Sequence, residues 1–460
     1  MSRTNAIEFV YLIAAVCFIV ALKGLSSPRG ARTGNLIGAA GMVTAVGATF
    51  ATPGLHRIGL IVVALVIGTA AAIPAARMVR MTAIPQMVAA FNGVGGAAAA
   101  LVSLAEFDRA ASHTSFGTAA AVVFSAFVGA VSFSGSAVTF AKLQELMTGQ
   151  PVVIRAQRLV NGTLAAATIG LAVWALAGRS VPAVVLLALV ALALGVLFVL
   201  PVGGADVPVV ISLLNSFTGL AVAATGAVLR TTLLIVAGTL VGASGTLLTR
   251  MMSQAMGRSL GNILFGAITA APTSAAAVDT GGDRSVRTGT VDDVAVLVGY
   301  ARRVLVVPGY GLAVAQAQHV IRELADLLER RGVDVVYGIH PVAGRMPGHM
   351  NVLLAEANVP YEQLREMDDV NSQMGLTDVA LVVGANDVVN PAARDSPGSA
   401  IYGMPIINVD QAHAVVFLKR SMRPGFAGID NVLLYDAKTT MLFGDAKDTL
   451  SALVAAVKVL

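Results

Sequence analysis

Nine apolar runs of membrane-spanning length fill the first half of this 460-residue chain. A helix needs about 20 consecutive apolar residues to cross the hydrocarbon core of a bilayer. Only 12% of the residues are charged, against about 25% in a soluble globular protein. The sequence therefore predicts an α-helical polytopic domain in a lipid bilayer, with spans near residues 6–22, 34–51, 58–76, 83–103, 117–141, 160–178, 182–202, 207–229 and 231–249.

The basic residues between the runs alternate in density, which predicts the topology. Clusters of Lys and Arg mark the cytoplasmic loops of membrane proteins. An odd number of spans then places the N-terminus outside and everything after the last span in the cytoplasm. The first run is followed by Lys23 without a cleavage signal, so we interpret it as a retained helix. Clusters occur at Lys23, Arg29 and Arg32, at Arg77 and Arg80, and at Lys142, Arg155 and Arg158, whereas the intervening loops carry Arg57, Arg109, Arg179 and Arg230.

This topology also accounts for most of the basic residues, so the net charge of +5 does not indicate nucleic-acid binding. The single cysteine, Cys17, lies in an apolar run. One cysteine can form neither a disulfide framework nor a cysteine-ligated metal site. His340 and His349 have no cluster of carboxylates or thiols near them in the sequence. We expect them to be structural or to contact a cofactor, and we predict no metal site.

The composition changes between residues 260 and 290, where Ala, Thr, Ser and Gly predominate. Such a segment buries little apolar surface and is typical of a linker. We therefore expect a membrane domain at 1–259, a linker at 260–289 and a second domain at 290–460. The second domain alternates β-rich and helical patterns, which predicts an α/β Rossmann-like, doubly wound parallel sheet. Strands are expected at 303–307, 333–337, 379–383, 405–409 and 414–418, and helices at 311–330, 350–358 and 447–459.

A glycine-rich turn follows the first of these strands. Gly309, Gly311 and Val314 form a Gly-x-Gly-x-x-Val pattern between a β-branched run and an apolar-periodic helix. This strand, turn and helix arrangement is typical of sites where the pyrophosphate of a dinucleotide meets backbone amides at a helix N-terminus.

Two further strand ends favour NADP(H) over NAD(H). An NAD site places an acidic residue after the second strand to bind the ribose hydroxyls, but here that strand runs into Gly338-Ile339-His340. The strand at 414–418 is instead followed by Lys419-Arg420-Ser421. A guanidinium, an ammonium and a hydroxyl suit a 2′-phosphate. A solvated basic loop is the alternative.

Several longer motifs resemble the NADP(H)-binding domain of proton-translocating NAD(P) transhydrogenase, and two resemble its membrane domain. The chain looks like the whole beta subunit of that enzyme. The motifs of the second domain are Pro308–Gly311, Gly338–His349, Val383–Asp387, Lys419–Met422 and Leu442–Lys447, and those of the membrane domain are Val202–Pro208 and Leu214–Gly219.

The resemblance implies an activity, partners and a location. It implies hydride transfer of the Si/Re-specific type between NADH, bound by a separate alpha subunit, and NADP+, bound by this chain, coupled to proton translocation. It also implies a dimer of alpha/beta units in a bacterial inner (cytoplasmic) membrane. The cofactors carry the redox chemistry and the protein positions them.

The same resemblance implies the cofactor contacts. In this family the dinucleotide lies in a reversed orientation, so the glycine turn need not hold the usual part of it. Lys419, Arg420 and Ser421 are expected to hold the 2′-phosphate. The remaining contacts carried over are Gly309, Tyr310, Gly311, Val314, Val342, Ala343, Gly344, Arg345, Met346, Pro347, Gly384, Ala385, Asn386, Asp387, Val388, Gly425, Phe426, Asp445 and Ala446.

Four polar residues in or beside the spans are candidates for a proton path. Asn92 and Asn215 lie inside apolar helices, where they could order water or fasten neighbouring helices. Some transhydrogenases have a histidine where this chain has Asn92, and an amide cannot carry a proton, so Asn92 would have to order water. Asp206 is the carboxylate nearest the cytoplasmic side of the bilayer, or else a helix N-cap. Ser244 lies among small residues and could instead be a close-packing position.

Asp387 follows the strand at 379–383, at the edge where open α/β sheets place ligands. Our preferred interpretation is a functional carboxylate whose protonation responds to NADP+ versus NADPH. The alternative is a turn-forming residue beside Asn386.

A transporter or channel regulated by a cytoplasmic NADP(H)-sensing domain is the alternative function, although no channel selectivity filter is evident. A haem or quinone oxidoreductase has less support, because no pair of histidines lies within the predicted spans.

Overall fold

A computed structural model describes most of the chain. The described residues are 3–25, 28–110, 115–148, 151–154, 156–203, 206–256, 259–261, 263–264, 285–345, 348–396, 399, 401–425 and 427–460. The chain forms two compact units. The first, here called the helical unit, comprises Met1–Arg80, Gln86–Pro201 and Val210–Thr249. The second, here called the sheet unit, comprises Met81–Pro85, Val202–Val209 and Arg250–Leu460.

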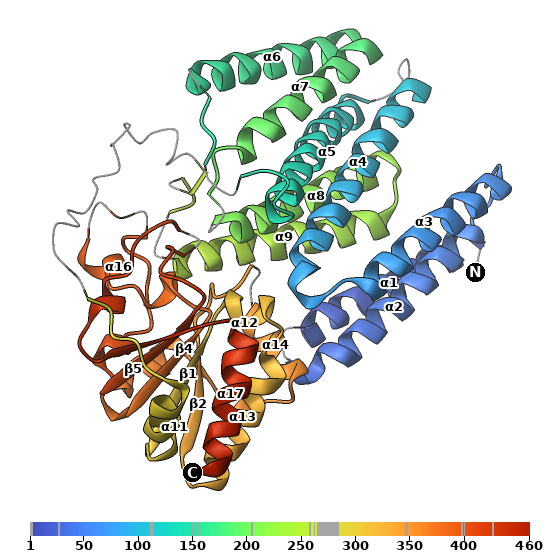
Figure 1. Ribbon diagram of the computed structural model, residues 1–460. Helices are drawn as coiled ribbons and strands as arrows, with labels where there is room; N and C mark the ends of the chain where they lie inside the picture. Colours follow the sequence, from blue (N-terminus) through green and yellow to red (C-terminus); the bar gives the residue numbers. More distant parts are fainter. Residues whose placement is uncertain are drawn as a thin grey trace. The chain divides into compact units, whose positions relative to one another are not determined.

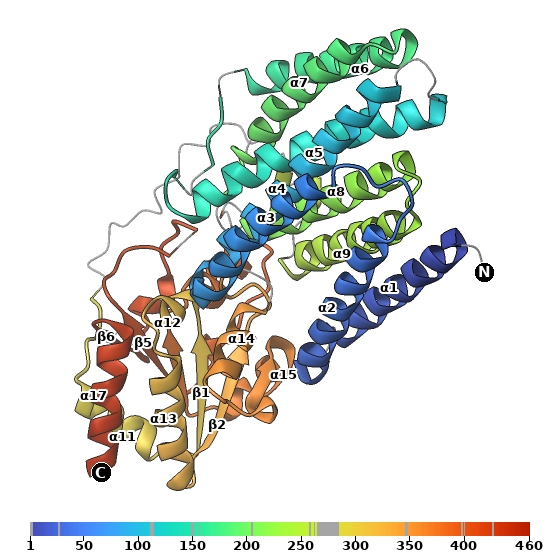
Figure 2. The ribbon, with the colours of Figure 1, turned by 90° about the vertical axis from the view of Figure 1, so that its right-hand side faces the viewer.

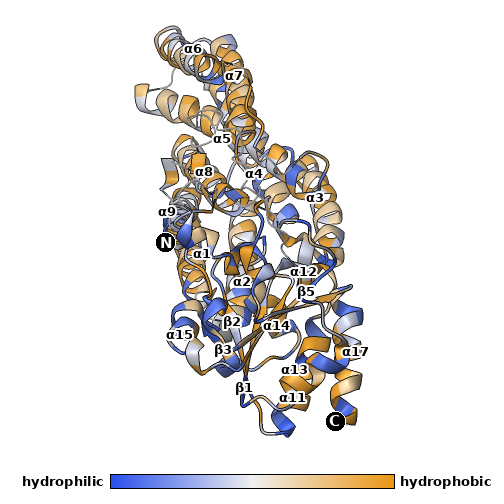
Figure 3. Cartoon of the chain, turned by 60° about the vertical axis from the view of Figure 1, so that its left-hand side comes forward, coloured by the Kyte–Doolittle hydropathy of each residue, from blue (hydrophilic) through white to orange (hydrophobic). Residues whose placement is uncertain are grey.

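Long helices make up the helical unit, and in hydropathy colours they are largely apolar (Figure 3). In the described part of the chain, eight helices are long and apolar enough to span a membrane. The exception among the predicted spans is α2, because Arg29, Arg32 and several glycines lower its mean hydropathy. The helices are α1 (Arg3–Leu25), α2 (Pro28–Phe50), α3 (Ile58–Met78), α4 (Ile84–Ala110), α5 (Phe116–Leu143), α6 (Gln157–Gly178), α7 (Val181–Val199), α8 (Val207–Val228) and α9 (Thr232–Ala255).

Helix α5 carries much of the packing in this unit. Most of its residues from Ala119 to Leu143 are buried. It approaches α4 through glycines, since a Cβ atom added to Gly129 would lie 2.5 Å from the backbone oxygen of Gly96 on α4. Without a hydrophobic driving force in lipid, helices associate through such close backbone approach and through polar contacts between side chains.

The sheet unit contains six parallel strands in the order β3-β2-β1-β4-β5-β6. This is the strand order of doubly wound dinucleotide-binding folds. In these folds the strands are added in one direction from β1 to β3 and in the opposite direction from β4 to β6, so the order reverses between β1 and β4. The predicted α/β class is therefore confirmed. The strands are β1 (Arg303–Pro308), β2 (Asp334–Ile339), β3 (Leu364–Glu366), β4 (Val379–Val383), β5 (Ala414–Lys419) and β6 (Thr439–Phe443).

Both faces of the sheet are covered, which explains why the central strands are continuous apolar runs. One core joins the sheet to α11 (Val291–Gly299), α12 (Tyr310–Val314), α13 (Gln318–Arg330), α14 (His349–Glu356) and α17 (Ala446–Val459). Figures 1 and 2 show α13 and α17 side by side on that face. The opposite core includes α15 (Met367–Ser372) and residues of four 3-10 turns. Those turns are Met374–Leu376, Asp387–Val389, Val409–Gln411 and Val432–Tyr435; the remaining short elements are α16 (Ala392–Asp395), Met81–Ala83 and Tyr361–Gln363.

Three local predictions were wrong. The apolar segment 405–409 is not a strand, although Ile406 and Ile407 are buried. Strands β3 and β6 were not predicted. The helix expected at 311–330 is two helices, because the chain turns at 315–317 with Gln316 in the left-handed region (φ 52°). Most of the predicted linker lies outside the described residues, but Thr288 pairs with Met441 beside β6.

Candidate functional site

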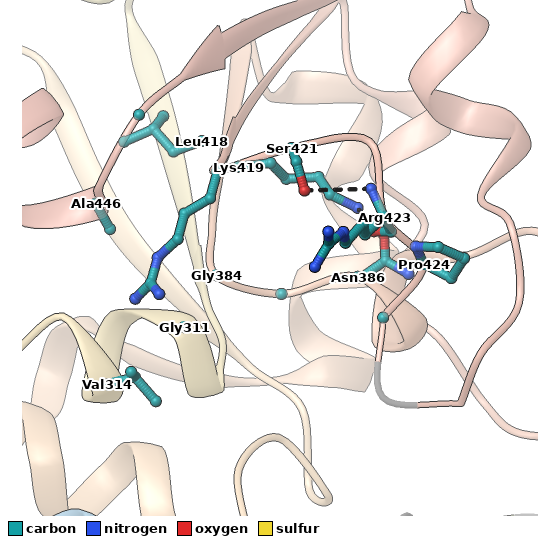
Figure 4. Close-up of a pocket in the computed structure, with 14 residues that line it drawn as sticks. Gly311, Val314, Gly384, Asn386, Leu418, Lys419, Ser421, Arg423, Pro424 and Ala446 are labelled. Carbon is teal, nitrogen blue, oxygen red and sulfur yellow. Dashed lines mark hydrogen bonds between the residues drawn. The ribbon is translucent and has the colours of Figure 1, made fainter.

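A cleft lies at the carboxyl ends of β1, β4 and β5. It consists of two adjoining cavities of about 350 and 230 Å³ that share residues of the loops after β1 and β4. This edge of a doubly wound sheet, at the switch in strand order, is where such folds bind ligands. The first cavity is lined by Gly311, Val314, Gly384, Ala385, Asn386, Leu418, Lys419, Arg420, Ser421, Arg423, Pro424, Gly425, Gly444 and Ala446 (Figure 4).

Glycines allow the two loops to meet backbone to backbone. A Cβ atom on Gly309 would lie 2.3 Å from the Gly384 oxygen, and one on Gly311 would lie 2.6 Å from the Gly384 Cα atom. Gly384 itself has a φ of +68°, which favours glycine. The amide of Gly311 donates to the Gly384 oxygen at 3.0 Å. The glycine pattern is thus explained by loop contact as much as by a ligand, since that amide already has a partner.

Lys419 brings a cation to the floor of the cleft. Its Nζ atom donates to Asn386 Oδ1 at 3.0 Å and to the Arg423 oxygen at 3.1 Å. Burial lowers the pKa of Lys419, and the carboxylates of Asp387 and Asp430 act in the opposite direction. A partly desolvated ammonium gains from any anion that enters the cleft.

Arg420 and Ser421 lie at the rim. The Arg420 guanidinium is 3.5 Å from Asp445 Oδ2, and its side chain is 62% exposed. Such an exposed pair contributes little stability, so the guanidinium can reorient toward a ligand. Asp445 also caps α17 by accepting from the Lys447 amide. Ser421 Oγ accepts from the Arg423 amide at 3.4 Å (Figure 4).

Asp387 is held in place in the lining of the second cavity. Its Oδ2 atom accepts from the Ala427 amide at 2.9 Å, and its Oδ1 atom accepts from Asn386 Nδ2 at 3.0 Å. A Cβ atom on Gly425 would lie 2.6 Å from Asp387 Oδ1, so only glycine leaves room there. The carboxylate is therefore fixed by two donors while it lines the second cavity.

Tyr310 and the loop after β2 form part of the second cavity's wall. The guanidinium carbon of Arg345 lies 4.3 Å from the centre of the Tyr310 ring, a cation–π contact. The Arg345 amide donates to His349 Nδ1 at 3.0 Å. Burial, with a smaller contribution from the charge of Arg345, lowers the pKa of His349. The neutral ring of His349 therefore orders the backbone beside the cavity.

His340 has a structural role at the start of the same loop. Its Nε2 atom donates to the Pro405 oxygen at 2.7 Å, because its Nδ1 atom already accepts from the Val342 amide. Burial lowers the pKa of His340 to about 4. The ring stays neutral near pH 7 and fastens the loop to the segment around Pro405.

Most of the predicted cofactor residues line this one cleft. The second cavity contains Gly309, Tyr310, Val342, Ala343, Gly344, Asp387 and Val388 in addition to the shared residues. Met346, Pro347 and Phe426 lie outside the described residues. Sequence reasoning missed Met256, Ile401, Met404, Leu418, Arg423, Pro424, Ala427 and Gly444. Arg423 could have been predicted, because it is a third basic residue and lies two residues after Lys419-Arg420-Ser421.

In the helical unit, Asn92 lies in a buried polar cluster. Its Nδ2 atom donates to Ser136 Oγ at 2.9 Å and to Ser132 Oγ at 3.3 Å. Ser132 is in turn 2.6 Å from Thr218 Oγ1 on α8. Among the described residues, the buried Asn92 Oδ1 atom has no hydrogen-bond partner. An unpartnered acceptor of this kind can accept a hydrogen bond from a water molecule.

The other three candidates form no hydrogen bond with this cluster among the described contacts of their own units. Asn215 is half-buried and makes no side-chain hydrogen bond to any residue that the structure describes, whereas its neighbour Ser216 bonds Thr246 at 2.7 Å. Ser244 is exposed and donates to the Val241 oxygen of its own helix. Asp206, in the sheet unit, is buried at the start of α8.

Fold and site together define a polytopic membrane protein that carries a dinucleotide-type parallel-sheet domain. The family model described as NAD(P) transhydrogenase beta subunit matches residues 7–456. The chain belongs to this family. Two sequences named NAD(P) transhydrogenase subunit beta, both from Rhodospirillum rubrum, are 47% identical to it over 454 residues, which cover 97% of this chain and 98% of each relative. The resemblance inferred from the motifs is thereby confirmed.

Proposed function

We propose that this chain binds NADP(H) in the cleft at the carboxyl ends of β1, β4 and β5. The observation that carries the proposal is the position of Lys419, Arg420 and Ser421, which gather two cations and a hydroxyl at one end of a dinucleotide-sized cleft. Charge-assisted bonds to a phosphate monoester need such a set. At the end of β2, the chain offers Gly338, Ile339 and the neutral His340 in place of the acidic residue of NAD sites.

The residues present fit such a cofactor. Among the described residues, the partly buried Lys419 ammonium donates to one side-chain amide oxygen and one backbone oxygen, so an anion would improve its surroundings. The glycines of both loops let the loops pack closely together at the edge of the cleft. NADP(H), when bound, supplies hydride acceptance and donation. The chain's contribution is to orient it, to exclude water and to hold Asp387 beside it.

In this proposal, Asp387 links the cofactor to the rest of the protein. Its carboxylate faces the second cavity while the Ala427 amide and Asn386 hold it. A change of charge on a ring nearby would favour one protonation state of the carboxylate over the other. The loops that bind Asp387 would then respond to the redox state of NADP(H).

We further propose that hydride transfer to or from NADP(H) is coupled to proton translocation through the helical unit. An alpha subunit, which the name beta implies, would bind NAD(H). Asn92, with Ser132, Ser136 and Thr218, supplies a buried hydrogen-bonding cluster that can order water. The basic loops favour a cytoplasmic sheet domain in a bacterial inner membrane, with pairs of alpha/beta units as the assembly.

Cofactor choice is tested by binding. The full chain in detergent is titrated with NADP+ and with NAD+ in a calorimeter. We expect saturable binding of NADP+ and at least a hundredfold weaker binding of NAD+, a difference of about 2.7 kcal/mol. Equal affinities would refute the 2′-phosphate assignment. They would leave the family membership intact.

A further inference from the structure

One buried basic side chain stands out in the helical unit. Lys142, in the last turn of α5, is 5% exposed, and it is the only buried lysine or arginine among the described residues of that unit. Its Nζ atom donates to the Leu200 oxygen at 2.7 Å and to the Val199 oxygen at 3.2 Å, at the carboxyl end of α7. An ionisable residue buried among spanning helices is costly and marks a functional site by default.

Lys142 lies one turn beyond a buried polar stripe on α5. Ser125, Ser132, Ser136 and Thr139 are all buried, and at 100° per residue they fall within about 60° of one another. Lys142 follows Thr139 by three residues, an axial rise of about 4.5 Å and a rotation of about 60° away from the stripe. The stripe therefore leads from the middle of the helix toward the end that carries the ammonium.

Hydroxyls along the stripe are joined to neighbouring helices. Ser125 Oγ is 2.8 Å from Thr225 Oγ1, which is 3.0 Å from Ser103 Oγ. Seven residues on, Ser132 meets Thr218 and Asn92. Each hydroxyl can donate and accept, so protons can be relayed along such bonds and intervening water. Neither these hydroxyls nor the Asn92 amide takes up or releases a proton of its own near neutral pH.

Fastening α7 does not by itself require a charged group. The Gln157 amide donates to the Leu197 oxygen at 3.1 Å, and the Val152 amide donates to the Leu200 oxygen at 3.0 Å. Neutral donors thus serve the same helix end. A lysine differs from them because a buried ammonium can be deprotonated, whereas an arginine stays charged.

We propose that Lys142 is a proton-carrying residue of the translocation route. The neutral amine accepts a proton from a hydronium ion beyond the end of the α5 stripe, which leaves a neutral water molecule, and its nitrogen lone pair forms the new N–H bond. The ammonium then gives one proton to a water molecule on the cytoplasmic side, which restores the amine. No electrons are exchanged. This role rests on the proposed function, in which the helical unit moves protons.

Few other charges lie on the neighbouring segments. Helix α7 has no ionisable residue. On α4, Gln86 donates to the Leu143 oxygen beside Lys142. The ionisable residues of α4, which are Glu106, Asp108 and Arg109, are at the opposite end of that helix. On α6, Arg158 follows Gln157. The carboxylate nearest in sequence is Glu145, three residues after Lys142, and the connection from α7 to α8 carries Asp206.

The test uses the full chain with its alpha partner in sealed vesicles. Lys142→Arg keeps the donors and the charge but cannot release a proton, and Lys142→Met removes both. We expect each to reduce NADPH-driven proton uptake at least tenfold while NADP(H) affinity stays unchanged. Lys23→Met, at the exposed end of α1, is the matched control and should pump normally. Normal pumping by Lys142→Arg would overturn the proposal and leave a role in fastening α7.

A second variant guards against misfolding of the arginine substitution. Lys142→Cys is made in a Cys17→Ala background and alkylated with bromoethylamine, which installs a lysine-like amine of lower basicity. We expect pumping to return with its pH profile displaced to lower pH. A restored but undisplaced profile, or no restoration in protein that still binds NADP(H), would contradict a titrating Lys142. An unsubstituted protein that moves no protons would instead refute the proposed function itself.

Discussion

The Lys419 ammonium donates to Asn386 Oδ1 at 3.0 Å and so joins the end of β5 to the loop after β4. The same amide donates from Nδ2 to Asp387 Oδ1, also at 3.0 Å. A cation, an amide and a carboxylate therefore form one chain of contacts across the cleft. Any ligand that competes for the ammonium will change the hydrogen bonds of Asp387, which connects phosphate recognition to the proposed redox-sensitive carboxylate.

Replacement of both Lys419 and Arg420 by Ala is expected to weaken NADP(H) binding. Loss of two charge-assisted contacts should cost about 2–5 kcal/mol. Calorimetry on the full chain measures the affinity. A Lys458→Ala/Arg330→Ala double variant removes the same charges from exposed positions of α17 and α13 and should bind normally. If the two double variants have equal affinities, the phosphate lies elsewhere.

Gly311→Ala is expected to disrupt the cleft by steric conflict. The added Cβ atom would lie 2.6 Å from the Gly384 Cα atom, so the loops after β1 and β4 must separate. We expect NADP(H) affinity to fall at least tenfold, as measured by fluorescence titration. Gly375→Ala is the control, because a Cβ atom there meets nothing within 4 Å. Wild-type affinity in Gly311→Ala would mean that the loops are not held as described.

The sheet domain should lose stability in mild acid through His340. Burial lowers the pKa of His340 to about 4 in the folded protein, while the unfolded value is about 6.5. Above pH 6.5 both states are neutral and stability is full. As the pH falls from 6.5 toward 4, the unfolded state takes up the proton first. The free energy of unfolding then decreases by about 3 kcal/mol in all. His349, whose pKa is also lowered, adds to the loss.

The unfolding temperature of the sheet domain, measured between pH 8 and pH 4, reports this loss. His340→Gln should flatten the curve because the amide does not titrate. His413→Gln changes a histidine whose side chain is 68% exposed and should leave the curve as it is. A His340→Gln curve that falls as steeply as the unsubstituted one would assign the acid sensitivity to other groups.

Asn92→Leu is expected to impair proton movement without affecting the nucleotide site. It removes the donor to Ser132 and Ser136 and the unpartnered buried acceptor. Proton uptake and coupled hydride transfer should fall together by at least tenfold, while NADP(H) affinity persists. Asn215→Leu is predicted to act in the same direction, although it removes no described hydrogen bond. Thr168→Val, on α6, removes only a bond to its own helix and is the control. Full pumping in both leucine variants would limit these amides to helix packing.

Sequence reasoning succeeded where a strand is recognisable from its apolar residues and the site residues directly follow that strand. The valine-rich β1, β4 and β5 are buried on both faces, so their apolar runs predict them directly. The cations at Lys419 and Arg420 follow a recognisable strand, and parallel strand ends share one edge. The carboxylate of Asp387 follows β4, a second recognisable strand. These three facts suffice to bring most of the cleft together before any coordinates are known.

The errors have physical causes. Leu364–Glu366 is short and mostly polar, because an edge strand needs little burial, so it has no apolar signal. The segment 405–409 is apolar because Ile406 and Ile407 fill a core, yet its Pro405 oxygen binds His340 and its Ile407 amide binds the Val388 oxygen instead of a strand. Apolar periodicity continues through the break at Gln316, so only backbone geometry reveals it. Lys142 contacts the carboxyl end of α7, and the sequence does not indicate which helices are neighbours.

The most direct test of the central claim is coupled turnover in sealed vesicles that contain this chain and its alpha partner. NADPH formation from NADH and NADP+ is measured with and without an imposed proton gradient. We expect the rate to rise several-fold when the gradient drives protons toward the side of the sheet domain, and to return to the basal value when an uncoupler collapses the gradient. NADPH formation that is absent, or that is the same with and without the gradient, would contradict the account.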